Sequence, residues 1–111
     1  MAQNYLRNVR DQYEAYSFPK RNPDDERRRL IACELDMLAK INHFGFRGCQ
    51  SFGSDFHALV AGAGTGDSAI YLAEQLRSRG GRVTYLDISL ASQDLARRRA
   101  EIRGQIGRAH V

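Results

Sequence analysis

Apolar and polar positions in the second half of the chain form blocks that predict strands and helices in turn. The run from Phe56 to Ala61 is short and mainly apolar, which is typical of a buried parallel strand. Apolar residues then recur at helical spacing as far as Arg79. The predicted elements are a strand over 56–61, a helix over 67–79, a strand over 83–86 and a helix that begins at Ser89 or Ser92. This order is the opening of a right-handed parallel α/β unit, so we expect an α/β fold.

The first half of the chain predicts helices instead. A single amphipathic helix is expected over 23–43, because Asn22 suits the N-cap, Pro23 suits the first helical position and apolar residues recur on one face. A shorter helix is expected within 6–16, before Pro19. These elements divide the chain into a helical lead-in (1–44), a connector (45–55), an α/β part (56–105) and a tail (106–111).

The composition fits one small globular domain. The 111 residues are 42% hydrophobic and 27% charged, which are ordinary values for a folded protein. The longest uninterrupted apolar run, Ala58–Ala61, is too short to span a membrane, and the first residues form no apolar signal segment. We therefore expect a cytoplasmic protein that does not enter a membrane.

The charge leaves a nucleic-acid partner open. Seventeen Lys and Arg residues against 13 Asp and Glu residues give a net charge of +4. A basic nucleic-acid-binding module without catalysis, which would use the run Arg97–Arg99, is therefore one alternative, beside an Arg-rich surface that is simply solvated. Cys33 and Cys49 form no recognised zinc-ligand spacing with the histidines, so no metal is expected.

A glycine-rich loop carries the chemistry that the sequence predicts. It joins the first predicted strand to the following helix and has the sequence Gly62-Ala63-Gly64-Thr65-Gly66-Asp67. Glycines let the backbone turn sharply and let a ligand touch it, and the amides at the start of the helix can donate to polar groups. Asp87 follows the next strand, 21 residues after Gly66, where it would face the same crevice. Because a carboxylate there can accept from both hydroxyls of a ribose, the predicted ligand carries an adenosine-like sugar.

The spacing of the glycines selects among nucleotide ligands. The dinucleotide pattern G-x-G-x-x-G would need glycine where Asp67 stands. A fragment of a nicotinamide- or flavin-dependent oxidoreductase is a second alternative function, and this difference disfavours it. The loop also lacks the G-K-[ST] ending of a P-loop, which disfavours triphosphates.

The pattern G-x-G-x-G resembles motif I of the class I S-adenosylmethionine-dependent methyltransferases, and the resemblance extends over Ala58–Arg103. Segments 13–19 and 22–26 are similar to the lead-in of one bacterial branch, which is sometimes fused to tetratricopeptide repeats. The resemblance implies an incomplete Rossmann-like methyltransferase fold, S-adenosylmethionine as cofactor and methyl transfer as the reaction. Val60 departs from the family, in which many members carry Asp or Glu at that position.

The resemblance also implies which residues hold the cofactor. The glycines would approach its methionine and ribose portions, Asp87 would hold the ribose hydroxyls, and Ile88 would lie against the adenine. Tyr16 or Phe18 would cover the sulfonium, which is attracted to aromatic faces. No catalytic residue and no methyl acceptor follow from the sequence. The cofactor-binding residues implied are Gly62, Ala63, Gly64, Thr65, Gly66, Asp67, Asp87 and Ile88.

The sequence predicts fewer strands than such a fold requires. A doubly wound sheet of this kind has roughly five or more strands, whereas two are predicted here. Residues 106–111 resemble the translation of a sequencing adapter, and we expect them to be non-native. We therefore expect the chain to hold only the cofactor-binding half of a methyltransferase, to be inactive by itself and to be marginally stable.

Overall fold

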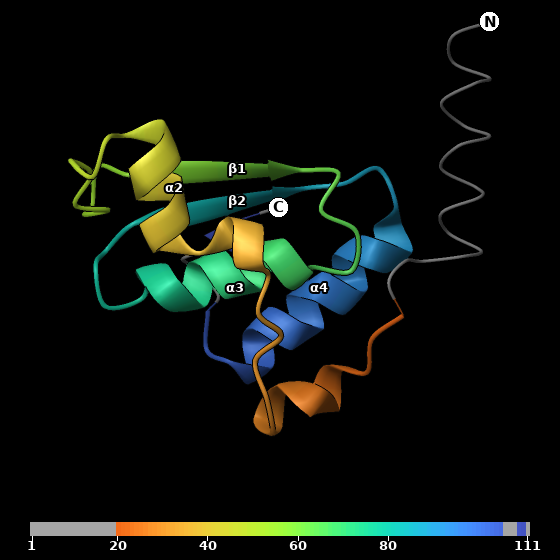
Figure 1. Cartoon of the computed structure of the whole chain (residues 1–111). Helices are drawn as coiled ribbons and strands as arrows, with labels where there is room; N and C mark the ends of the chain where they lie inside the picture. Colours follow the sequence, from red (N-terminus) through yellow and green to blue (C-terminus); the bar gives the residue numbers. More distant parts are fainter. Residues whose placement is uncertain (1–19, 106–108, 111) are drawn as a thin grey trace, which may run out of the picture.

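The computed structural model describes residues 20–105 together with the backbone of 109 and 110. The described part is a small α/β domain with a parallel sheet, and the predicted order of strand, helix, strand and helix is confirmed (Figure 1). The 3-10 helices are η1 (Pro23–Arg27) and η2 (Glu34–Asp36), the α-helices are α2 (Leu38–Gly45), α3 (Asp67–Leu76) and α4 (Leu90–Ile102), and the strands are β1 (His57–Ala61), β2 (Arg82–Leu86) and β3 (Ala109–His110).

The sheet places β2 between its two neighbours. β1 pairs with β2 in parallel register, from His57 opposite Arg82 to Ala61 opposite Leu86. The short strand β3 pairs with the other edge of β2, also in parallel. The sequence predicts two strands, and the third lies in the tail (106–111), which is expected to be non-native. Its pairing uses backbone groups, which any residue except proline offers in full.

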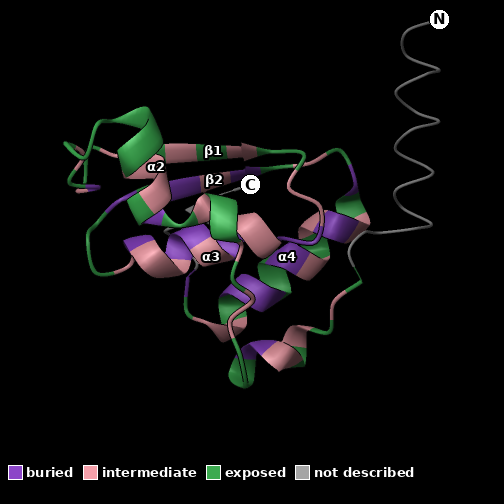
Figure 2. Ribbon diagram, in the orientation of Figure 1, coloured by how far each residue is buried: buried purple, intermediate pink, exposed green. Residues whose placement is uncertain are grey.

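The helices cover one face of the strands. In β2, Val83 and Tyr85 are buried while Arg82 and Leu86 on the alternate face are exposed. No residue of β1 is buried (Figure 2). Leu59 in its middle is 64% exposed. The prediction of a buried strand over 56–61 is therefore wrong, because within the described residues α3 and α4 lie on the same side of the sheet (Figure 1). The other sheet face, which carries Leu59 and Leu86, consequently remains open to solvent.

The hydrophobic core lies between that helical layer and the sheet. The largest share of it comes from α3, whose buried residues recur at helical spacing as the sequence predicts. The connector also contributes, because Phe52 is buried and meets the ring of Phe56 edge to face at 4.9 Å. The buried residues of the core are Leu38, Phe52, Ala69, Leu72, Ala73, Leu76, Val83, Tyr85 and Ala96.

The prediction of one amphipathic helix over 23–43 is wrong. The helix starts as predicted, since the side chain of Asn22 caps the amide of Asp24, but η1 ends at Arg27. Further on, α3 supplies partners for the backbone between η2 and α2, because Gln75 donates to the carbonyl of Asp36 and accepts from the amide of Leu38. These long-range hydrogen bonds replace helical ones, and the segment follows the surface of α3 and α4 instead.

A buried ion pair attaches the lead-in to α4. The carboxylate of Glu26 and the guanidinium of Arg99 are each 1% exposed and lie 3.2 Å apart. Glu26 also accepts from Nε of Arg103 at 2.6 Å. Because an unpaired buried charge is costly, each partner requires the other for the packed state.

The Glu26→Gln variant tests this attachment. We expect it to lose about 3–5 kcal/mol of the free energy of unfolding, or to unfold, because the guanidinium of Arg99 loses its buried counter-charge. The matched control is Asp24→Asn, which removes an exposed carboxylate 3.8 Å from Arg27 and should cost less than about 1 kcal/mol. The free energy of unfolding of each variant is measured by urea unfolding followed by circular dichroism. Equal losses of this free energy in both variants would contradict the assigned role of Glu26.

Candidate functional site

The glycine loop follows β1 at the carboxyl edge of the sheet. Gly62, Gly64 and Gly66 all have positive φ angles, of 67°, 59° and 108°. Residues with a side chain rarely adopt a positive φ, so the backbone conformation of the loop favours glycine at these three positions. At Gly66 a Cβ atom would also lie 2.9 Å from Cβ of Ala96, whereas at Gly62 it would meet no atom within 4 Å. The loop is therefore packed against α4 at one end and open at the other.

Asp87 lies directly against this loop, as the sequence predicts for residues at one sheet edge. Its Oδ2 accepts from the amide of Gly64 at 2.8 Å, and its Oδ1 accepts from the amide of Ser89 at 2.9 Å. A carboxylate offers about four acceptor sites, and these bonds use one on each oxygen. The half-buried carboxylate can thus hold the loop and still accept further hydrogen bonds.

Tyr85 is a residue of this site that the sequence analysis missed. Its hydroxyl donates to the carbonyl of Gly64, the same residue whose amide meets Asp87. Burial, and then the negative charge of Asp87, raise the pKa of Tyr85, so the hydroxyl keeps its proton. Residues two apart along a strand point to the same face of the sheet. The spacing of Tyr85 and Asp87 was therefore the signal that could have placed Tyr85 at this site.

The other end of the loop is held by arginines. Thr65 is fully buried, and its carbonyl accepts from Nη1 of Arg99 at 2.9 Å. Asp67 accepts from Nη1 of Arg99 at 2.8 Å and from Nε and Nη2 of Arg21 at 2.9 and 2.7 Å. Burial by itself would raise the pKa of Asp67, but the hydrogen bonds from both guanidinium groups outweigh it and lower the pKa. Asp67 is therefore an anion at neutral pH.

The remaining predicted residues take different places. Ala63 belongs to the turn, where its amide donates to the carbonyl of Leu86 at 3.2 Å. Ile88 is 44% exposed beside Asp87, so its side chain is accessible. The side chain of Asp67 is engaged in the ion pairs just described, and Thr65 is fully buried. Tyr16 and Phe18, expected over the sulfonium, lie outside the described residues.

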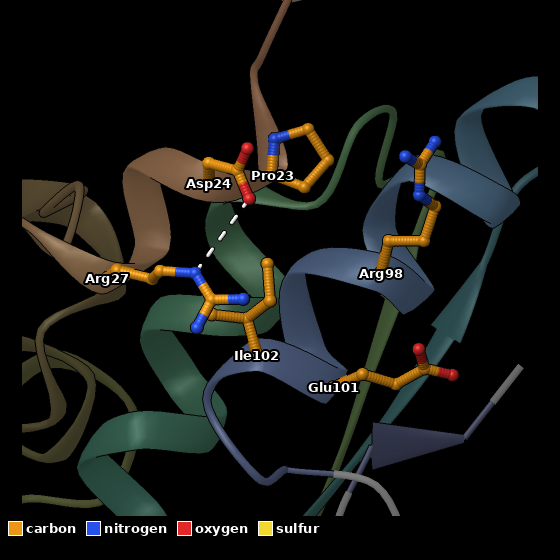
Figure 3. A pocket seen from close by; sticks show the side chains of 6 residues that line it. All are labelled: Pro23, Asp24, Arg27, Arg98, Glu101 and Ile102. Carbon is orange, nitrogen blue, oxygen red and sulfur yellow. Dashed lines mark ion pairs between the residues drawn. The ribbon is translucent and has the colours of Figure 1, made fainter.

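A groove of about 450 Å³ lies between η1 and α4, and none of its lining residues belongs to the glycine loop. Figure 3 shows the side chains that line this groove. Arg27 and Arg98 line it, yet both are near acidic partners, Asp24 and Asp94, at 3.8 Å. Because Arg99 is buried, the run 97–99 does not present three cations to a nucleic acid.

The comparisons with protein-family models, curated proteins and solved structures found no significant match to this chain. Among the described residues, none of the helices combines the length and apolarity needed to cross a membrane. Over the same ranges, His, Cys, Asp and Glu side chains form no group of three that could hold a metal ion.

The Gly66→Ala variant tests the packing of the loop. We expect it to lose about 2 kcal/mol or more of unfolding free energy, because the new Cβ combines a left-handed backbone with a clash against Ala96. Gly45→Ala is the control, since a Cβ there meets no atom within 4 Å and should change stability by at most about 1 kcal/mol. Thermal melts that fall equally for both variants would contradict the geometry.

The pH dependence of stability tests the pairing of Asp67. Since its pKa is lower in the folded state than in the unfolded one, the stabilisation is fully present above the unfolded value of about 4 and is lost as pH falls through the folded value. Asp67→Asn should lower the unfolding free energy at pH 7 by about 1–3 kcal/mol and flatten its decline between pH 5 and pH 2. A decline as steep as that of the wild type would refute the pairing.

Proposed function

We propose that this chain binds S-adenosylmethionine through the glycine loop and Asp87, as the cofactor-binding part of a class I methyltransferase that acts in the cytoplasm. The observation that carries the proposal is the 2.8 Å hydrogen bond from the Gly64 amide to Asp87. It unites, at one edge of a parallel sheet, the exposed backbone and the acidic group that a nucleoside requires.

The chemistry of these residues fits a nucleoside. The carboxylate of Asp87, which offers about four acceptor sites, suits the two hydroxyls of a ribose, which are donors. The space above Gly62 suits close approach to backbone, and the exposed side chain of Ile88 suits an adenine ring. Tyr85 supports the arrangement by holding the carbonyl of Gly64 while Asp87 holds its amide.

The residue at the start of α3 favours a ligand without phosphates, because Asp67 stands where the dinucleotide pattern has its third glycine. In dinucleotide-binding proteins a pyrophosphate lies at this helix end, beside a glycine. Here the anionic carboxylate of Asp67 stands at that position and already pairs with Arg21 and Arg99. The third glycine of the dinucleotide pattern is thus replaced by a carboxylate that is already engaged, whereas S-adenosylmethionine, which carries no phosphate, needs no pyrophosphate site at this helix end.

S-adenosylmethionine supplies a methyl group that its sulfonium has already activated for in-line transfer. The described residues would therefore bind and orient the cofactor, and they need not move a proton. Asp87 would hold the ribose, and the backbone of the glycine loop would face the cofactor.

Calorimetric titration of the whole chain tests the proposal. S-adenosylmethionine should bind, and Asp87→Asn should weaken it by about 1–3 kcal/mol because one charged acceptor is lost. Asparagine can still accept from the Gly64 amide, so the loop is retained. Asp55→Asn, an exposed carboxylate that precedes β1 at the opposite end of the sheet, is the control. Binding of NAD in place of S-adenosylmethionine would overturn the proposal, and unchanged affinity in Asp87→Asn would remove Asp87 from the site.

A further inference from the structure

We propose that Arg99 is a positioning residue for the glycine loop, and that its buried pair with Glu26 makes the conformation of this loop, and hence ligand binding, depend on the docked lead-in. The binding consequence rests on the proposed function. The structural part concerns only the loop, α4 and the lead-in residues 20–29.

A single guanidinium joins three parts of the chain. Nη1 of Arg99 donates to the carbonyl of Thr65 at 2.9 Å and to Oδ1 of Asp67 at 2.8 Å. Nε and Nη2 donate to Oε2 of Glu26 at 3.3 and 3.2 Å. The side chain is 1% exposed, so these contacts are made away from solvent. The fork geometry of arginine permits this bridge, which the single ammonium of lysine cannot reproduce.

The bond to Thr65 fixes the peptide on which the turn depends. That peptide joins Thr65 to Gly66, whose φ is 108° and whose amide donates to the carbonyl of Ala63 at 3.2 Å. The orientation of the Thr65 carbonyl therefore sets the direction of the Gly66 amide, which closes the turn. Gly64 and its contact with Asp87 lie within this turn.

The lead-in supplies the opposite charges. Glu26 faces Arg99 from η1, and Arg21 faces Asp67, so positive and negative groups alternate in the order Arg21, Asp67, Arg99, Glu26, Arg103. Without Glu26, the buried charge of Arg99 loses one of its two carboxylate partners, and its place beneath the loop becomes costly. Docking of the lead-in and ordering of the loop are thus linked, and a ligand that requires the ordered loop must also favour the docked lead-in.

The decisive experiment compares Arg99→Lys and Glu26→Gln with Arg103→Lys in the whole chain. Arg103 pairs with the same carboxylate at 2.6 Å, and it makes no contact with the loop that the structure records. The first measurement is hydrogen exchange of the Gly64 and Gly66 amides without ligand, at a temperature where each variant is folded. The second is the affinity for S-adenosylmethionine.

Arg99→Lys and Glu26→Gln should each speed exchange at Gly66 at least tenfold relative to amides in β2 and weaken binding at least tenfold. Arg103→Lys should change the exchange rate at Gly66 and the affinity less than threefold, even if its melting temperature falls as far as those of the other two variants. Equal effects in all three variants would overturn the positioning role. If Arg99→Lys does not fold, Glu26→Asp, which keeps the charge and shortens its reach, takes its place with the same expected exchange at Gly66.

The ligand-free measurement separates this proposal from the proposed function. A wild-type chain that fails to bind S-adenosylmethionine would refute the proposed function, while selective exchange at Gly66 in Arg99→Lys would still support the role of Arg99. Binding that is normal in the wild type and equally normal in Arg99→Lys would refute the role of Arg99 and leave the proposed function standing.

Discussion

The described structure depends on the ion pairs of the buried Arg99 guanidinium. This guanidinium lies between the lead-in and the glycine loop, and it is balanced by Glu26 on one side and by Asp67 on the other. A buried charge is tolerated only when its partners are in place, so the three segments that provide them must come together. The position of η1 and the shape of the loop therefore have a common cause, although they are about 40 residues apart in sequence.

The candidate site is held from two directions. Asp87 and Tyr85 fix the amide and the carbonyl of Gly64 from the end of β2, and Arg99 fixes the carbonyl of Thr65 from α4. The loop backbone is consequently constrained before any ligand arrives, which reduces the entropy that binding must overcome. The open sheet face, with Leu59 exposed, shows that the described residues build only one layer of helices against the strands.

Local patterns predicted the α/β part well and the lead-in poorly. The order of strands, loop and helices from 57 to 102 follows from runs of apolar residues, glycines and capping serines, all of which act within a few residues. The boundaries differ slightly, since α3 ends at Leu76 and not at Arg79, and Ser89 is the cap among the two serines predicted. The single helix over 23–43 failed because its backbone takes partners from Gln75, about 40 residues away. Arg99 resembled part of a solvated basic run, since nothing nearby in sequence shows that Glu26 will bury it. Asp87 was predictable because parallel strands end at the same sheet edge.

The most direct test of the central claim is a titration of the isotope-labelled chain with S-adenosylmethionine, followed by the NMR shifts of backbone amides. The account predicts that the largest shifts fall on Gly62, Gly64 and Ser89, because these amides lie in the loop or donate to Asp87. Shifts confined to the groove between η1 and α4, or no shifts at all at saturating ligand, would contradict it.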